Sequence, residues 1–227
     1  MEIHVLTIFP EMIDAALGHS IPRIAREKGV LKIVAHDLRD YTTDKHRKVD
    51  DAPFGGGPGM ILKPEPVFRA VEAVAPTLPA ATRKIILTPQ GETFTQAKAR
   101  EFAGVDALFL ICGRYEGFDQ RIIDGLGFEL LSIGDYVLSG GEIAAMAVAD
   151  AVARLLPGVL GDVESNRQES FEEGLLDFPQ YTRPAEFRGM KIPEVLLSGH
   201  HEEIRKWRRE MAFEETRKRR RDLLDGK

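Results

Sequence analysis

The sequence predicts an α/β fold built on a parallel sheet. Five short stretches rich in β-forming residues are separated by segments with helical periodicity. These stretches are apolar throughout, which is typical of parallel strands that helices cover on both faces. A chain of 227 residues is long enough for one substantial core and a smaller second unit.

The expected strands and helices alternate along most of the chain. Strands are expected at Glu2–Phe9, Val30–Asp37, Lys84–Thr88, Ala107–Cys112 and Phe128–Ile133. Helices are expected at Pro10–Ala16, Pro64–Ala75, Thr95–Phe102, Phe118–Gly125 and Glu142–Leu156. This alternation predicts crossover connections between parallel strands.

The remainder of the chain differs in composition. Residues 157–169 have little hydrophobic periodicity and several glycine and polar residues, which is typical of a linker. A turn-rich piece and a charged helix from about His200 to Leu224 follow, and the helix carries an apolar stripe that we expect in a core: Ile204, Trp207 and Met211. We therefore expect a main domain at 1–160, a linker at 161–169 and a small, mainly helical domain at 170–227.

Composition and charge exclude several classes of protein. With 31 Lys and Arg against 36 Asp and Glu, the formal net charge is −5, which argues against indiscriminate coating of nucleic acid. No signal peptide or membrane span is apparent, so we expect a cytoplasmic protein without a membrane partner. Cys112 is the only cysteine and ends an apolar run, so we expect a packing residue and no cysteine-based metal site.

Positive charge is concentrated near the end of the chain. The cationic residues from Arg205 onward are Arg205, Lys206, Arg208, Arg209, Arg217, Lys218, Arg219, Arg220 and Arg221. They could line a phosphate-binding face. They could equally form a solvated helix with salt bridges to Glu210, Glu214 and Glu215.

A glycine-rich segment at residues 54–60 follows a basic run at residues 45–48. Glycines let a backbone approach a ligand closely, basic side chains can meet phosphates, and Asp50 between them can accept hydrogen bonds from a base edge. The segment matches neither the P-loop nor the dinucleotide fingerprint. By itself it slightly favours a flexible surface loop with a solvated run of charges.

Three further loops begin where expected strands end, at residues 87–91, 112–117 and 133–141. In a parallel sheet such loops meet at one edge, where ligands bind. Each loop alone would be an ordinary turn, but together they predict a pocket with apolar walls and exposed backbone groups. Without a phosphate-binding fingerprint, the expected ligand is a nucleoside-containing molecule held in another way.

Residues 167–184 mix carboxylates, aromatic rings and arginines without periodicity, which is typical of a loop that becomes ordered around a substrate. The run from His200 to Glu203 does not have the spacing of a zinc-binding helix. We therefore expect no metal site in the protein itself.

The motifs at residues 49–60, 113–117, 133–141 and 174–184 closely resemble those of the bacterial tRNA (guanine-N1)-methyltransferases, in the same order along the chain. The resemblance implies a SPOUT fold, in which a parallel sheet ends in a C-terminal trefoil knot, a topology that general rules on chain crossing would exclude. It also implies a homodimer whose active site lies at the subunit interface, with tRNA as the partner.

The resemblance further implies that S-adenosylmethionine binds in the knot loops. The cofactor-binding residues would be Leu87, Thr88, Pro89, Gly113, Tyr115, Glu116, Gly117, Ile133, Gly134, Asp135, Tyr136, Val137, Leu138, Gly140 and Gly141. It also implies a magnesium requirement, although the sequence shows no dedicated metal cage and the ion would act through the substrate.

The reaction implied is methylation of N1 of the guanosine immediately 3′ of the anticodon. N1 bears a proton, so the reaction needs a general base for N1 and a cation near O6. By resemblance these are Glu169, where the family most commonly has aspartate, and Arg154. The residues implied to hold the guanine and its neighbourhood are Asp50, Gly59, Met60 and Asp177.

Two alternatives have different consequences. A SPOUT relative could methylate another RNA position, such as a ribose 2′-hydroxyl, although the motifs at 55–60 and 169–184 match the guanine-N1 group. An RNA-binding module with a nucleotide-sensing domain would bind S-adenosylmethionine without turnover on any tRNA.

Overall fold

The computed structural model of the chain describes residues 1–160 and 169–225. The chain divides into two compact units, Met1–Gly161 and Asp162–Lys227. The linker predicted at 161–169 lies outside the described residues, apart from Glu169.

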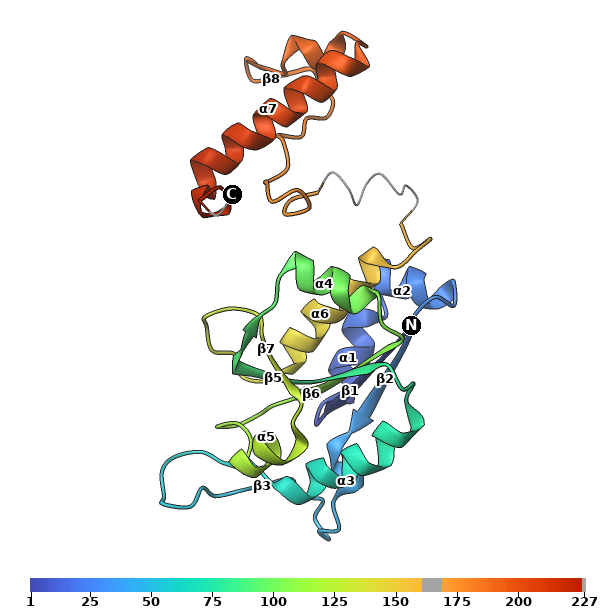
Figure 1. Cartoon of the computed structure of the whole chain (residues 1–227), viewed down its shortest axis with the longest axis vertical. Helices are drawn as coiled ribbons and strands as arrows, with labels where there is room; N and C mark the ends of the chain where they lie inside the picture. The colour runs from blue at the N-terminus through green and yellow to red at the C-terminus, as the bar shows by residue number, and fades with distance from the viewer. Residues whose placement is uncertain (161–168, 226–227) are drawn as a thin grey trace. The chain divides into compact units, whose positions relative to one another are not determined.

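The first unit contains a five-stranded sheet (Figure 1). Its strands are β1 (Glu2–Thr7), β2 (Lys32–Asp37), β5 (Thr82–Thr93), β6 (Ala107–Cys112) and β7 (Glu129–Ser132). Their order is β2-β1-β6-β5-β7, and every neighbouring pair is parallel. The predicted α/β class with a parallel sheet is therefore confirmed.

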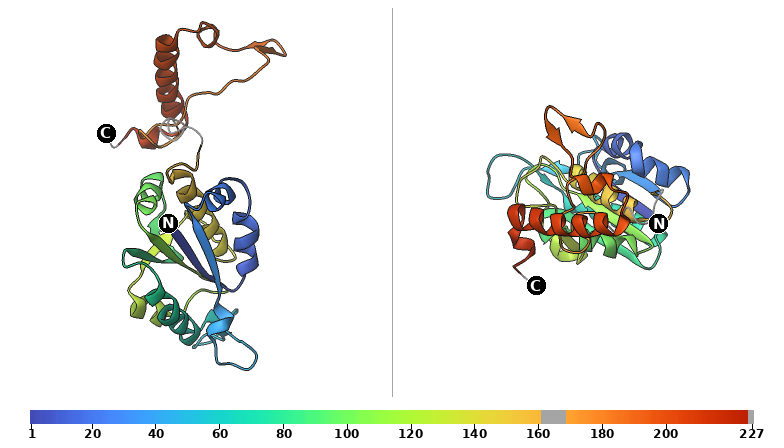
Figure 2. Two further views of the ribbon diagram at one scale, coloured as in Figure 1. Left: turned by 90° about the vertical axis from the view of Figure 1, so that its right-hand side faces the viewer. Right: turned by 90° about the horizontal axis from the view of Figure 1, so that it is seen from above.

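Helices cover both faces of this sheet (Figure 2). One face is covered by α1 (Pro10–Leu17), α2 (Ser20–Glu27), α4 (Gln96–Ala103) and α6 (Glu142–Leu155). The other face is covered by α3 (Pro64–Val74) and α5 (Gln120–Leu126). All six residues of the central strand β6 are buried, which explains why the strand sequences are apolar throughout.

Two features of the first unit differ from the sequence expectation. Helix α2 was not predicted, because only Pro22 and Ala25 within it are buried and its apolar periodicity is short. Strand β5 continues to Thr93 beyond the expected end, and Leu131 of β7 faces both Leu87 and Glu92. The four residues between that pair bulge from the ladder at the ligand-binding edge.

Short elements complete the first unit. An antiparallel pair of two-residue strands, β3 (Asp50–Asp51) and β4 (Ile61–Leu62), closes the glycine-rich loop into a hairpin. Two short 3-10 helices, η1 (Leu38–Tyr41) and η2 (Ala75–Thr77), follow β2 and α3.

The second unit consists of one long helix with irregular chain packed against it. Its elements are β8 (Glu186–Phe187), β9 (Met190–Lys191), η4 (Glu194–Leu197), α7 (His201–Arg219) and η5 (Arg221–Leu223). The buried residues of α7 are Ala212 and Thr216. The expectation that Ile204, Trp207 and Met211 form the core was wrong in degree, because these side chains are only partly buried. In the described parts of both units, we find no helix with the length and apolarity to cross a membrane.

Candidate active site

The loops that follow β6 and β7 cross in direct backbone contact. The amide of Gly141 donates a hydrogen bond to the Gly113 carbonyl (2.8 Å), and Arg114 and Gly140 form an isolated antiparallel bridge. A Cβ atom at Gly141 would lie 2.8 Å from the Cα of Cys112, closer than real Cβ contacts come. Only glycine therefore fits at this crossing.

A hollow lies between the ends of β5 and β7 and the start of α6. Its lining residues are Leu87, Thr88, Pro89, Leu131, Ser132, Ile133, Gly134, Tyr136, Leu138, Gly141 and Ala144. The walls combine aliphatic side chains with backbone groups, a Thr hydroxyl and a Ser hydroxyl. Such a lining is suited to a small molecule with one apolar, planar part and a few polar groups.

The loop after β7 is held in place by its own hydrogen bonds. The Ser132 hydroxyl donates to the Gly134 carbonyl (3.1 Å) and accepts from the Gly134 amide (3.2 Å). The amide of Tyr136 also donates to the Gly134 carbonyl (3.0 Å). Gly134 has φ 146°, which a residue with a side chain rarely adopts. The rim of the hollow is thus a defined turn.

The structure brings together part of the predicted cofactor set. Those that line the hollow are Leu87, Thr88, Pro89, Ile133, Gly134, Tyr136, Leu138 and Gly141. Those that do not line it are Gly113, Tyr115, Glu116, Gly117, Asp135, Val137 and Gly140. Leu131, Ser132 and Ala144 also line the hollow but were not predicted. They lie at a strand end and in a helix turn, where the sequence pattern does not indicate ligand binding.

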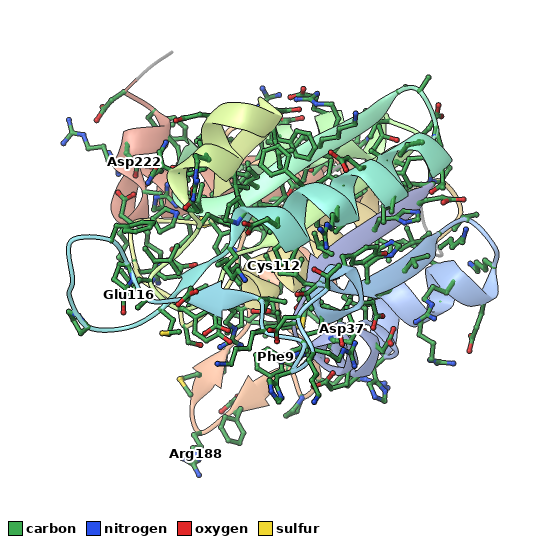
Figure 3. The ribbon with its side chains drawn as sticks, turned by 90° about the horizontal axis from the view of Figure 1, so that it is seen from below. Phe9, Asp37, Cys112, Glu116, Arg188 and Asp222 are labelled. Atoms are coloured by element: carbon green, nitrogen blue, oxygen red, sulfur yellow. The ribbon has the colours of Figure 1, made fainter. Side chains whose placement is uncertain are left out.

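The glycine-rich hairpin lies against the loop after β6. The Glu116 amide donates to the Met60 carbonyl (2.9 Å), and the Leu62 amide donates to the Gly117 carbonyl (3.0 Å). A Cβ atom at Gly59 would clash with the Glu116 carboxylate, whose position is labelled in Figure 3. Gly59 and Met60, predicted to hold the substrate, therefore adjoin Glu116, which is predicted to hold the cofactor.

Asp50 and Tyr115 are electrostatic neighbours in this region. Partial burial and the nearby Asp50 carboxylate raise the pKa of the Tyr115 hydroxyl, against the opposing influence of Arg39 and Arg114. Tyr115 has φ 59° and about half of its side chain is exposed. Both residues thus keep a polar group available at the hairpin.

Cys112 is confirmed as a packing residue. It is buried and belongs to the core on the α6 side of the sheet. Burial raises the pKa of its thiol well above the ordinary value, so the nucleophilic thiolate is disfavoured.

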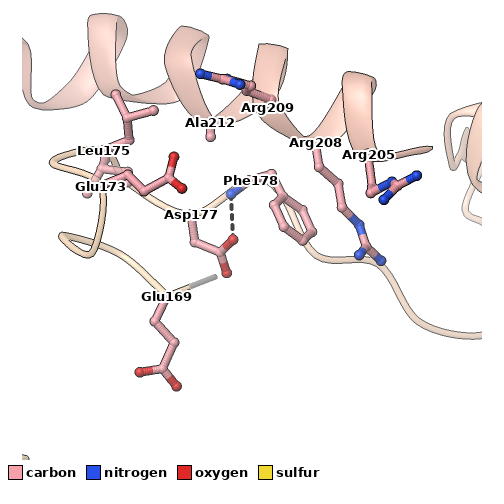
Figure 4. Close-up of a pocket in the computed structure, with 10 residues that line it drawn as sticks. Glu169, Glu173, Leu175, Asp177, Phe178, Arg205, Arg208, Arg209 and Ala212 are labelled. Atoms are coloured by element: carbon pink, nitrogen blue, oxygen red, sulfur yellow. Dashed lines mark hydrogen bonds between the residues drawn. The ribbon is translucent and has the colours of Figure 1, made fainter. Parts of the chain in front are cut away.

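The predicted catalytic pair is divided between the two units. Arg154 lies in the last turn of α6 in the first unit, whereas Glu169 lies in the second. Glu169 and Asp177 line a second hollow together with Arg205, Arg208 and Arg209 (Figure 4).

Asp177 shapes its own loop. Its carboxylate accepts hydrogen bonds from the Phe178 amide (2.8 Å) and from Nε2 of Gln180 (3.0 Å), and its amide donates to the Ser170 hydroxyl (2.9 Å). The turn around Asp177 is therefore fixed before any substrate arrives. Within residues 1–160 and 169–225, there is no group of three His, Cys, Asp or Glu side chains that could hold a metal ion.

Comparison with known proteins identifies the relatives of the chain. Residues 1–226 match the model of the tRNA (Guanine-1)-methyltransferase TrmD family. A tRNA (guanine-N(1)-)-methyltransferase of Heliobacterium modesticaldum is 56% identical over 100% of this chain and 86% of its own length. The enzymes with the same name from Halalkalibacterium halodurans and Moorella thermoacetica are 52% and 56% identical, over 100% and 99% of this chain and 92% and 90% of their own lengths.

Proposed function

The chain belongs to the tRNA (Guanine-1)-methyltransferase TrmD family, and we propose that it transfers a methyl group from S-adenosylmethionine to N1 of the guanosine immediately 3′ of the anticodon. The observation that carries the proposal is the contact between the glycine-rich hairpin and the loop after β6. This contact joins the residues expected to hold the guanine to those expected to hold the cofactor.

The hollow between β5, β7 and α6 fits the cofactor in its chemistry. Leu87, Ile133 and Leu138 supply apolar walls for an adenine ring, and backbone groups at the strand ends can read its polar edge. Close packing at Gly141 leaves no room for a side chain at the crossing of the loops. When bound, S-adenosylmethionine supplies an electrophilic methyl group on a positively charged sulfur.

Three residues have assigned parts in the reaction. The Glu169 carboxylate would take the proton from N1 of guanine while the nitrogen forms its bond to the methyl carbon, the bond from that carbon to sulfur breaks, and a neutral thioether is left. The guanidinium of Arg154 stabilises the negative charge that builds on O6. Asp50 accepts hydrogen bonds from the base edge and helps to hold the guanine away from its stack.

Glu169 and Arg154 belong to different units of the chain. We propose that the active site combines them across a homodimer, with the first unit of one subunit and the linker and second unit of the other. In this assignment the fold is of the SPOUT type, and the loops after β5, β6 and β7 form a trefoil knot. The reaction would take place in the cytoplasm, and any magnesium requirement would act through the tRNA.

The direct test uses two unmodified tRNA transcripts that differ only at the nucleotide 3′ of the anticodon, guanosine in one and adenosine in the other. We expect labelled methyl transfer to the guanosine transcript alone, with the product mapped to N1. Equal labelling of both transcripts would place the target elsewhere and would support the rival SPOUT activity.

The role of Glu169 is tested with a matched pair of variants. Glu169→Gln should lower the rate at saturating substrates by about 10²–10⁴-fold, because the amide cannot accept the proton. Glu169→Asp should retain most of the rate, because it keeps the carboxylate. Near-normal turnover by Glu169→Gln in intact dimers would move the general base to another residue, with Asp177 as the next candidate.

A further inference from the structure

Glu142 is an acidic residue buried at the start of α6. It is 1% exposed, and both of its carboxylate oxygens have partners. Oε1 accepts a hydrogen bond from the Thr7 hydroxyl (2.7 Å), and Oε2 lies 3.0 Å from Nε of Arg114. The second contact is an ion pair with Arg114, whose side chain is 20% exposed.

The ion pair joins segments that are far apart in the sequence. Thr7 ends β1, Arg114 lies in the loop after β6, and Glu142 follows the Gly140-Gly141 pair of the loop after β7. A Cβ atom at Gly140 would clash with both Arg114 and Glu142, so the ion pair packs directly against this backbone. Glu142 therefore packs against the contact between the loop after β6 and the loop after β7.

Arg114 is also restrained on its other side. Its guanidinium carbon lies 4.6 Å from the centre of the Phe9 ring, within cation–π range. The Phe9 amide in turn donates to the Thr7 hydroxyl (2.9 Å), the same hydroxyl that donates to Glu142. Arg114 is thus contacted by Glu142 and by the Phe9 ring, whereas the Thr7 hydroxyl contacts Glu142 and the Phe9 amide but not Arg114 itself.

Buried ion pairs seldom increase stability over apolar residues of the same size, because desolvation offsets the attraction. Their best-attested contribution is to select one arrangement of the chain over others. The N-terminus of α6 also favours a carboxylate at Glu142. The selected arrangement here is the contact between Gly113 and Gly141, and Gly141 lines the proposed cofactor hollow.

We propose that Glu142 is a positioning residue of the cofactor site. Through its ion pair with Arg114 it holds the loop after β6 against the loop after β7, and so presets the walls of the hollow. The proposal rests on the proposed function, since it assigns the hollow to S-adenosylmethionine.

The test compares the two oxygens of the same carboxylate. Glu142→Gln removes the ion pair but can still accept the Thr7 hydrogen bond, and we expect the dissociation constant for S-adenosylmethionine to rise by about tenfold. The rate at saturating cofactor should stay within about twofold of wild type, because the effect of the looser loops appears in cofactor binding and is absent once the site is filled. Thr7→Val is the matched control, which should lower the midpoint of thermal unfolding and leave cofactor affinity unchanged.

Titration calorimetry with S-adenosylmethionine alone gives the readout without tRNA. If Glu142→Gln binds with wild-type affinity, or if Thr7→Val weakens binding equally, Glu142 has only a structural role and the proposal fails. If Glu142→Gln does not fold, Arg114→Lys replaces it, since lysine keeps the charge but has no Nε to meet Oε2; wild-type affinity in that variant would also overturn the proposal. Wild-type protein that binds no S-adenosylmethionine would instead contradict the proposed function itself.

Discussion

In each of the two units, one buried polar side chain of a helix holds a loop in place. These two buried polar contacts differ in kind. In the first unit Glu142 of α6 holds Arg114 by an ion pair. In the second unit the Thr216 hydroxyl of α7, fully buried, accepts from the Leu176 amide (2.8 Å) and donates to the Ala212 carbonyl (2.7 Å). The contact in the first unit is charged and lies in a sheet core that helices cover on both faces. The contact in the second unit is neutral and holds a loop to a single helix.

The difference shows how each unit can meet its ligand. The loops of the first unit that line its hollow are held by backbone hydrogen bonds and buried polar partners. The described part of the second unit has few buried side chains, and charged residues of α7 line its hollow. Cofactor binding should therefore depend on packing, and tRNA binding should depend on charge.

The largest effect is expected where the loops of the first unit cross. Gly141→Ala places a Cβ atom 2.8 Å from the Cα of Cys112 and 2.9 Å from the Gly113 amide nitrogen, both backbone atoms that cannot yield cheaply. We expect a loss of about 3 kcal/mol in the free energy of unfolding, and no measurable cofactor binding. Urea unfolding and calorimetry measure the two effects.

The control is Gly104→Ala at the end of α4. There a new Cβ would meet the carbonyl oxygens of Glu101 at 3.4 Å and of Arg100 at 3.9 Å, and φ is −89°. We expect its free energy of unfolding to change by less than about 0.5 kcal/mol. Wild-type cofactor affinity in Gly141→Ala would show that the crossing does not shape the hollow.

The sequence predicted the architecture of the first unit because its signals are local. Continuously apolar strands indicate a covered parallel sheet, and the buried strand β6 bears this out. Clusters of glycine at strand ends marked the loops correctly, since positions such as Gly134 need a positive φ. The assignments of individual residues to cofactor, guanine and catalysis stay predictions.

The buried polar contacts of Glu142 and Thr216 were not predictable from the sequence. In the sequence, Glu142 is indistinguishable from the acidic residues that commonly occupy the first turn of a helix. Its hydrogen-bond partner Thr7 is 135 residues away along the chain. Thr216 lies in a run of charged residues and does not extend an apolar pattern. The apolar pattern of this helix therefore predicted a core at Ile204, Trp207 and Met211. Contacts of this kind depend on three-dimensional packing, which local periodicity does not encode.

The contact of Thr216 in the second unit can be tested separately from the first unit. Trp207 is the only tryptophan of the chain and lies on α7, so tryptophan fluorescence reports on the second unit. Thr216→Val leaves the Leu176 amide without its acceptor, and we expect a loss of about 2 kcal/mol in the free energy of unfolding. The loss should appear in urea unfolding followed by tryptophan fluorescence. Thr216→Ser keeps the hydroxyl and should cost much less, so equal losses in both variants would assign the effect to packing of the methyl group.

A pH effect between pH 7 and pH 5 is expected in the first unit. Burial, and secondarily the charge of His4, lower the pKa of His36 from 6.5 to about 4. His36 Nε2 lies 2.9 Å from His4 Nδ1, His4 Nε2 lies 2.8 Å from the Glu2 carboxylate, and the Tyr41 hydroxyl lies 3.5 Å from His36 Nδ1. Because the unfolded chain binds this proton more readily, stability falls as the pH drops from about 6.5 towards 4.

We expect the first unit to lose about 1–2 kcal/mol between pH 7 and pH 5, measured by urea unfolding followed by circular dichroism. His36→Asn removes the titrating group and should flatten this part of the profile. The unfolding reported by Trp207 should not follow the same curve. A profile unchanged in His36→Asn would assign the pH dependence to other groups.

The smallest effect is expected from two groups of arginines that lie in α7 and directly after it. The paired tail consists of Arg217, Arg219, Arg220 and Arg221, which contact Glu214, Glu215, Asp222 and Asp225. Arg208 and Arg209 have no ion-pair partner in the described part of the chain, and both line the hollow of the second unit. The Arg208 guanidinium lies 4.7 Å from the centre of the Phe178 ring, which holds it in place.

The salt-bridge interpretation of the basic run is confirmed for the paired tail, whereas phosphate binding stays a prediction, which we assign to Arg208 and Arg209. Arg208→Gln with Arg209→Gln should weaken tRNA binding by about tenfold and reduce the slope of log affinity against log salt by about 1–2, as expected for lost phosphate contacts. Arg219→Gln with Arg220→Gln removes the same charge from the paired tail and should change affinity by less than about twofold. Filter binding at several salt concentrations measures both doubles. If the two doubles weaken binding equally, total charge and not the unpaired arginines governs tRNA affinity, and the contrast between a packed cofactor site and a locally charged tRNA surface fails at α7.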